Sequence, residues 1–353
     1  MTNLCSVLMR RRVLLPDCRS AIKVRHSVQP FDAASLTIGF TGGHEFRFPT
    51  GFRHPFLGHG PETFGVEFPR EESRELARAY PDFHHESAHN IFLDAWNAQG
   101  LPGALILLAW TGMGLLSAWR ARAAQPGLTG ALASALAASV VCHWFSVFSA
   151  TTALFFYVTI GVLASLNDGR AVAKLRFYAA VPLAAALALC GIGVLAGDRL
   201  LQRAADALSA GRFDEAEQLY TSARNGYVRA DLRYSRQLVS SAQAGRDLFS
   251  SLRLWQRAIE AGHRATESDD DPANAWYHLA TVSALRGDAV NTEQALRRAI
   301  AAAPNWYKPH WTLALLLQMT GRVSEARAEA ANALDLNNGR SPEVAKSLAS
   351  LQQ

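Results

Sequence analysis

The hydrophobic positions of the 353-residue chain are concentrated in its middle part, between residues 101 and 197. Four apolar stretches lie there, and each approaches the ~20 residues that a helix needs to cross the hydrocarbon core of a membrane. They are residues 101–119, 129–148, 150–166 and 177–197. The second and third stretches meet at Ser149 with almost no loop, which predicts a tight helical hairpin.

After residue 197 the pattern changes to amphipathic helices that repeat. The segment AGRFDEA at residues 210–216 recurs as TGRVSEA at residues 320–326, and weaker copies lie between them. Their glycines, at positions 211, 245, 287 and 321, are separated by 34, 42 and 34 residues. A period of 34 residues with paired helices resembles the tetratricopeptide family.

The small residues of the repeats fit this interpretation. We expect each glycine to end a first helix, and the small residues that follow it to let a second helix pack closely. These residues are Ala216, Thr292 and Ala326 five positions after the glycine, and Ala223, Ala299 and Ala333 twelve positions after it. Pro304 ends its repeat, and the 42-residue interval predicts a lengthened helix or an inserted acidic loop. Such arrays bind a protein or peptide partner; a scaffold that only stiffens the chain remains an equal alternative.

Basic residues in the connections predict the orientation of the apolar helices. Arg120 and Arg122 follow the first stretch, and residues 170–176 between the third and fourth contain two arginines and a lysine. Because such residues are retained in the cytoplasm, both connections are expected there. The Ser149 turn, the residues before 100 and those after 197 are then extracytoplasmic.

These patterns predict an all-α protein of polytopic membrane helices followed by a tetratricopeptide α-solenoid. The expected parts are an N-terminal segment without a clear pattern (1–45), an extracytoplasmic loop (46–100), four transmembrane helices (101–197) and a repeat domain (198–353). The N-terminus lacks an apolar region long enough for a signal peptide, although the topology requires its export. We therefore expect the natural chain to carry further spans upstream.

Composition narrows the function classes. The net charge of +5 is spread along the chain without a basic stripe, so a nucleic-acid partner is not expected. The cysteines show neither metal nor disulfide spacing. They are Cys5, Cys18, Cys142 and Cys190.

Polar residues cluster just ahead of the first apolar stretch. His89 and Asn90 are followed by Trp96, Gly100 and LPG, while the segment HPFLGHGPETF occupies residues 54–64. Ionisable groups at the edge of a membrane mark a functional site. His85 to His89 also match H-E-x-x-H, in which two imidazoles on one helix face bind zinc and Glu86 serves as base. No third ligand follows at a familiar spacing, so a zinc metalloprotease is a remote alternative.

The His-Asn pair, nine residues, glycine and LPG resemble a motif of the bacterial O-antigen ligase and O-antigen polymerase family. Residues 54–64 resemble a second motif of that family, with Gly58 and Gly60 as its glycines, and the resemblance covers residues 50–166. It implies a multi-pass protein of the bacterial inner membrane that transfers a polyprenyl-diphosphate-linked glycan. The acceptor is a hydroxyl of a lipid core, of another glycan or of a protein side chain.

The resemblance also implies roles for individual residues and needs no metal or cofactor. His89 is the candidate general base, because a neutral imidazole can take the proton of the acceptor hydroxyl. Asn90 holds the loop or donates to the glycan, and Trp96 is placed to stack on a sugar ring. Arg47 and Arg53 are the candidates for binding the diphosphate.

Several alternatives stay open at the sequence level. Family members carry a further arginine in earlier membrane helices that have no counterpart here, so the chain is also interpretable as an inactive fragment or a membrane-anchored repeat adaptor. Arg70, Arg74 and Arg78 share a face every four residues, but interleaved glutamates favour a solvated, ion-paired helix over a phosphate site. His143 and Ser146 either line the site or form hydrogen bonds between helices.

Overall fold

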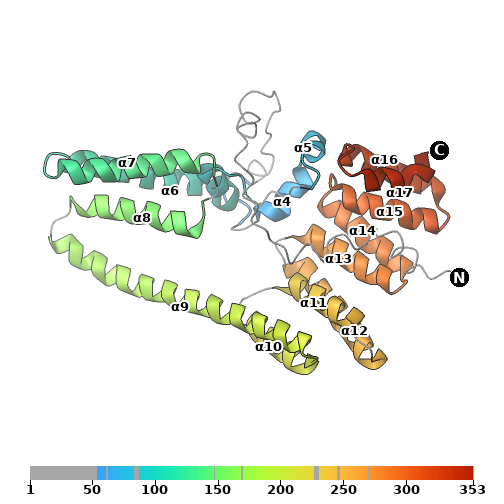
Figure 1. Ribbon diagram of the computed structural model, residues 1–353. Coiled ribbons are helices and arrows are strands. Elements are labelled where there is room, and N and C mark those ends of the chain that lie inside the picture. The colour runs from blue at the N-terminus through green and yellow to red at the C-terminus, as the bar shows by residue number, and fades with distance from the viewer. Residues whose placement is uncertain are drawn as a thin grey trace. The chain divides into compact units, whose positions relative to one another are not determined.

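The computed structural model describes residues 54–60, 63–82, 87–146, 148–167, 170–225, 230–244, 247–268 and 271–352. In these ranges the regular secondary structure is helical, and they contain no strand (Figure 1). The prediction of an all-α protein is therefore confirmed for this part of the chain. The helices fall into two units.

The first unit consists of residues 50–68 and 84–230 and contains the apolar helices. Its helices are α4 (Phe64–Glu71), which ends at the border of the two units, α6 (Ile91–Ala121), α7 (Pro126–His143), α8 (Ala150–Ser165), α9 (Arg170–Ser209) and α10 (Phe213–Asn225). The last of these helices packs against α9. The four apolar stretches of the sequence correspond to α6, α7, α8 and α9. The border expected between residues 197 and 198 lies inside α9, which continues without a break to Ser209.

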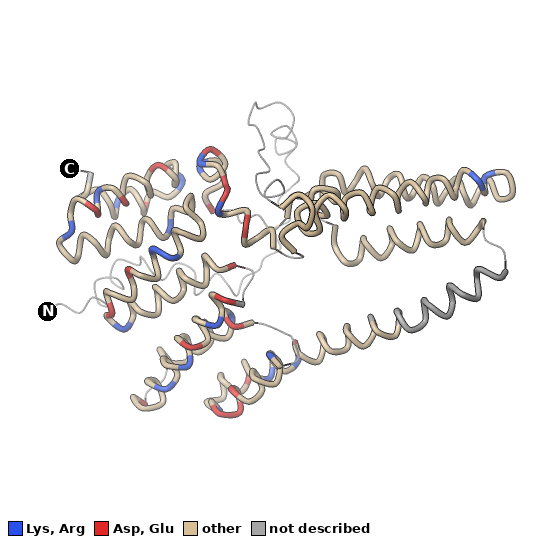
Figure 2. The backbone as a smooth tube through the Cα atoms, turned by 180° about the vertical axis from the view of Figure 1, so that it is seen from behind, with Lys and Arg blue, Asp and Glu red and all other residues tan. Residues whose placement is uncertain are grey.

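Two of these helices, α6 and α7, are long and apolar enough to cross a membrane, with mean hydropathies of 1.6 and 1.3 over their most apolar windows. The third, α8, is apolar but has only 16 residues. Figure 2 shows α6, α7 and α8 nearly free of charged residues along their length, with basic residues where α6 meets α7. Arg122 lies there, with its guanidinium 4.2 Å from the centre of the Trp119 ring.

Small residues let α6 approach α7 and α8. Gly114 is one place of close approach, because a Cβ atom there would lie 2.8 Å from Leu136 of α7 and 3.1 Å from Ile160 of α8. Leu136 and Ile160 are fully buried, together with Phe156. Packing of this kind replaces the hydrophobic effect as the main force between helices in lipid.

The second unit contains residues 69–83 and 231–353. Its helices are α5 (Arg74–Ala79), α11 (Asp231–Ala244), α12 (Leu248–Ser268), α13 (Pro272–Leu285), α14 (Ala289–Ala302), α15 (Tyr307–Met319), α16 (Val323–Asn337) and α17 (Pro342–Gln352). Neighbours in sequence pack as pairs, α11 with α12, α13 with α14 and α15 with α16, and each pair contacts the next.

The repeat glycines end helices as their spacing predicts. Gly211, Gly287 and Gly321 have φ values between 75° and 83°, a left-handed conformation that glycine adopts without a steric penalty. Gly245 lies outside the described residues. The small residues predicted to allow close packing are all buried, with at most 1% of their surface exposed. The 42-residue interval is taken up by α12, which at 21 residues is the longest helix of its unit.

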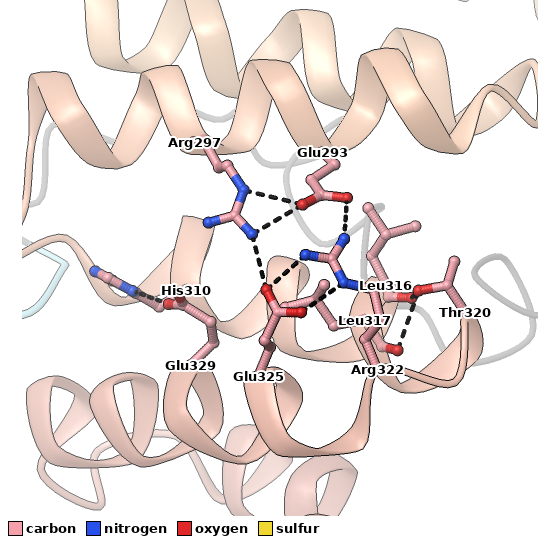
Figure 3. A network of polar contacts seen from close by, with 9 residues as sticks. All are labelled: Glu293, Arg297, His310, Leu316, Leu317, Thr320, Arg322, Glu325 and Glu329. Atoms are coloured by element: carbon pink, nitrogen blue, oxygen red, sulfur yellow. Dashed lines mark hydrogen bonds and ion pairs between the residues drawn. The ribbon is translucent and has the colours of Figure 1, made fainter.

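A network of charged side chains joins α14 to the first turn of α16 (Figure 3). Arg322 donates to Glu293 at 2.7 Å and to Glu325, while Arg297 donates to Glu293 at 2.9 Å and lies 3.4 Å from Glu325. Hydrogen bonds from Arg322 hold the pKa of Glu325 below its ordinary value. Arg297, Arg322 and Glu325 are exposed and Glu293 is half-buried, so the network adds modestly to the apolar contacts between the pairs.

Candidate functional site

The site is built where residues 54–60 contact α6 of the same unit. Gly58 and Gly100 make the contact possible, and both have left-handed φ angles, 66° and 69°. A Cβ atom on Gly58 would lie 2.6 Å from the backbone of residues 98–100, and one on Gly100 would lie 2.5 Å from the Phe56 carbonyl carbon. The two sequence motifs therefore meet through their glycines, where a side chain does not fit.

Backbone hydrogen bonds fix this contact. The His59 and Gly60 amides donate to the carbonyls of Asn97 and Ala98 at 2.8 and 3.0 Å. The Leu101 amide donates to the Pro55 carbonyl at 2.6 Å. At Gly100 the helix is interrupted, with ψ of −169°, so these backbone groups are released from the regular ladder and pair with the loop.

The loop also places two histidines side by side. The His54 and His59 rings are 4.8 Å apart in an edge-to-face arrangement. Gly60, with φ of 105°, turns the chain toward α4, and its carbonyl accepts a hydrogen bond from the Thr63 hydroxyl at 2.7 Å. Phe56 and Leu57 are largely exposed at the tip of the loop.

His89 lies outside any helix, one residue before the N-cap of α6. Its φ of 51° is uncommon for a residue other than glycine, and such strained positions are enriched at functional sites. The His89 amide donates to the Ser87 hydroxyl at 3.2 Å, and the residue is exposed. The imidazole is therefore presented to solvent by a constrained backbone.

Asn90 is the N-cap of α6. Its side-chain oxygen accepts from the amides of Phe92 and Leu93 at 3.0 and 3.1 Å, and its amide nitrogen donates to the Trp144 carbonyl at 3.3 Å. The Phe92 and Trp144 rings are 5.5 Å apart in an edge-to-face contact. Asn90 thus both begins α6 and ties it to the residues that follow α7.

Sequence reasoning missed Asn97, which is buried to 3% exposure on α6. Its backbone carbonyl accepts from His59, but its side-chain oxygen has no hydrogen-bond partner within the described residues. A buried amide oxygen without a partner carries a free-energy cost, so such a group is expected to accept from a ligand or water. Asn97 follows Asn90 by seven residues, which is about two helical turns, so both lie on the same side of α6. This spacing is the signal in the sequence that could have identified Asn97.

The structure brings some of the predicted site residues together and separates others. Gly58, Gly60 and Gly100 lie in one place, and Trp96, half-buried, is on α6 next to Asn97. His89 lies just before the N-cap Asn90, which is about 10 Å from Asn97 along the helix axis, seven residues at 1.5 Å each. Arg47 and Arg53 lie outside the described residues.

The structure bears on two alternative interpretations, the role of His143 and Ser146 and the zinc motif at residues 85–89. His143 and Ser146 form a hydrogen bond with each other, 3.2 Å between Nδ1 and Oγ, at the end of α7 rather than between helices. The zinc motif needs His85 and His89 on one helix, but His89 has a left-handed backbone and precedes α6. His85 and Glu86 are not among the described residues, and the described ones contain no group of three metal-binding side chains.

The third alternative concerned Arg70, Arg74 and Arg78 as one solvated face. They do not share a helix, because α4 ends at Glu71 and α5 begins at Arg74. Arg74 and Arg78 pair with Asp335 of α16, and the charge of Glu75 also acts on Arg78. The three arginines therefore do not form one face of a single helix, and Arg74 and Arg78 form ion pairs with a carboxylate that is distant in sequence.

No protein-family model matches the chain, and no curated protein matches its sequence.

Proposed function

We propose that this protein is a glycan transferase of the O-antigen ligase and polymerase type. The observation that carries the proposal is the contact between the two motif segments at Gly58 and Gly100, where α6, a helix apolar enough to cross a membrane, is interrupted. This contact joins the two segments that each resemble a motif of the family.

In this proposal His89 is the general base. Its imidazole takes the proton of the acceptor hydroxyl as the acceptor oxygen forms a bond to the anomeric carbon of the donor. The bond between that carbon and the diphosphate oxygen breaks on the opposite face, and the polyprenyl diphosphate leaves with the electron pair. The exposed position and constrained backbone of His89 suit a base that must reach a large acceptor.

The remaining residues would orient the glycan and stabilise the leaving group. Trp96 offers a ring on which a sugar can stack, and the Asn97 side-chain oxygen can accept from a glycan hydroxyl. The diphosphate requires cations, for which Arg47 and Arg53 remain the candidates. No metal or cofactor enters this scheme.

The proposed setting is the bacterial inner membrane. In it, α6 to α9 are membrane helices, the basic connections lie in the cytoplasm, and the motif residues and repeats face outward. The helix pairs from α11 to α16, with their glycine turns and buried small residues, support a tetratricopeptide solenoid.

The test is glycan attachment in a strain that lacks its own transferase. Expression of the chain is expected to restore attachment, and His89→Ala is expected to reduce it at least about 100-fold, the usual contribution of general-base catalysis. His263→Ala is the matched control, since it removes an exposed histidine from α12 and should leave attachment unchanged. Equal attachment by wild type and His89→Ala would contradict the proposal.

A second candidate, a membrane-anchored repeat adaptor, is favoured by one observation. The helix pairs of the second unit form a continuous packed array that needs no catalytic residue for its stability. If both the wild type and His89→Ala fail to restore attachment while inserting normally, this function, or an inactive fragment, replaces the first.

A further inference from the structure

Residues 72–82, here called the docking segment, lie against α15 and α16 of the second unit although more than 220 residues separate them in sequence. The segment is built around α5, whose N-cap is Ser73: the Ser73 hydroxyl accepts from the Leu76 amide at 3.2 Å. A helix of six residues is not stable on its own in water. Its order must therefore come from what it contacts.

Two arginines on one face of α5 contact acidic and amide groups of α16. Arg78 Nη2 lies 2.8 Å from both carboxylate oxygens of Asp335. Arg74 Nη2 lies 3.0 Å from the Asn332 side-chain oxygen and 3.4 Å from Asp335. The hydrogen bond to Asp335 raises the pKa of Arg78, so this guanidinium is charged at every accessible pH.

Side chains of the array also bind the backbone of the segment. Asn305 donates to the Glu72 carbonyl at 2.6 Å, and Arg340 donates to the Ala79 carbonyl at 2.9 Å. Side chains that pair with main-chain carbonyls hold a peptide by its conformation, independently of its sequence.

The carboxyl end of the segment has its own contacts. The Tyr307 hydroxyl donates to Asp82 at 2.9 Å, and the Lys308 ammonium lies 3.4 Å from the same oxygen. The segment thus presents two cations at one end and an anion at the other, and the array presents the opposite charges.

Apolar burial in this contact is small. Ala77, 3% exposed, is the one residue of the docking segment in the hydrophobic core cluster of the array. Burial also raises the pKa of Glu72 to about 7. The side chains of Arg74, Arg78 and Asp335 are 39–47% exposed, so each of these ion pairs is weak, and the covalent tether supplies the effective concentration that holds the segment in place.

We propose that the surface formed by α15, α16, Asn305 and Arg340 is a peptide-binding surface, and that its resident ligand is the chain's own docking segment. Asp335 binds two basic residues of the segment that are four positions apart, Arg74 and Arg78. Tyr307 and Lys308 bind the carboxylate of Asp82. This inference does not depend on the proposed glycan transfer.

Hydrogen exchange on the full chain in detergent or nanodiscs tests the proposal. The amides of Ala77 and Tyr80 report on α5, since they donate to the carbonyls of Ser73 and Leu76. Arg78→Asp and Asp335→Arg are each expected to speed their exchange about five-fold, the effect of losing exposed ion pairs. The double reversal, Arg78→Asp with Asp335→Arg, is expected to return exchange most of the way to the wild-type rate.

The controls separate docking from misfolding. Arg212→Asp breaks an exposed pair with Glu215 in the other unit and should leave the α5 amides unchanged. Amides of α13 and α14 should exchange at wild-type rates in every variant, which shows that the array is folded. Unchanged α5 exchange in both single reversals, or a double reversal no better than either single one, would overturn the proposal.

Discussion

At the residue scale, the contact between Gly58 and Gly100 is the tightest constraint on the candidate site. The atoms that a side chain would meet belong to backbone, which cannot rotate away as the end of a flexible side chain can. Both residues also have left-handed φ angles. The glycines are therefore required by geometry twice, once for conformation and once for space.

The first prediction follows from this contact. Gly58→Ala and Gly100→Ala should each destabilise the unit by about 2–4 kcal/mol, because a left-handed alanine and a backbone clash add together. Thermal unfolding in detergent measures the change. Gly112→Ala, in α6 where a Cβ meets no atom within 4 Å, is the matched control and should change the stability by less than about 1 kcal/mol. An equal response of Gly58→Ala and Gly112→Ala would contradict the packing described.

The site was only partly predictable from residues. The glycines and the Asn90 cap follow from local rules about turns and helix starts, and the structure agrees with them. The burial of Asn97 depends on the loop that folds over it, which no local pattern encodes. The catalytic role of His89 stays a prediction, since its geometry suits a base without testing one.

At the element scale, hydrophobic periodicity predicted most of the helices. Long apolar stretches and glycine-ended repeats each specify a helix through contacts with near neighbours in sequence. Two features of the helices were not predicted from the sequence. The continuity of α9 through residue 197 shows that a change in composition need not end a helix, and the docking of α5 on α16 joins residues 257 apart.

A buried hydrogen-bond chain joins three helices of the array and leads to the next prediction. The Ser235 hydroxyl of α11 donates to the Ala258 carbonyl of α12 at 2.6 Å and lies 2.8 Å from His278 Nε2 of α13. Because a hydroxyl has one proton, His278 must donate to Ser235. Burial, with a smaller contribution from Arg236, lowers the pKa of His278 to about 3.

Stability of this region should therefore fall in acid. His278 is neutral when folded and has a pKa near 6.5 when unfolded, so its contribution is complete above pH 6.5 and is lost as the pH falls toward 3. Between pH 7 and pH 5 the loss is about 2 kcal/mol. Opening free energies of α13 amides from hydrogen exchange measure it, and His278→Gln should remove this part of the pH dependence. The same slope in wild type and variant would argue against a buried neutral histidine.

At the scale of the whole molecule, the proposed topology separates two sets of residues. The connection between α6 and α7 contains Gln125 and is expected in the cytoplasm, whereas Ser209 at the end of α9 is expected outside. Both are exposed and suit cysteine labelling in a background where the native cysteines are serine. Ser209→Cys should react with a membrane-impermeant maleimide in intact spheroplasts, and Gln125→Cys only after permeabilisation. Labelling of both positions from one side would rule out this topology.

The central claim is that the protein transfers a glycan, with His89 as general base at the site formed by α6 and residues 54–60. Its most direct test is turnover by the purified full chain in proteoliposomes, measured as release of polyprenyl diphosphate from a linked glycan donor when an acceptor is added. We expect acceptor-dependent release by the wild type and a loss of at least about 100-fold in His89→Gln, which keeps a polar side chain but cannot act as a base. Release at the same rate by both proteins, or by neither, would contradict the claim.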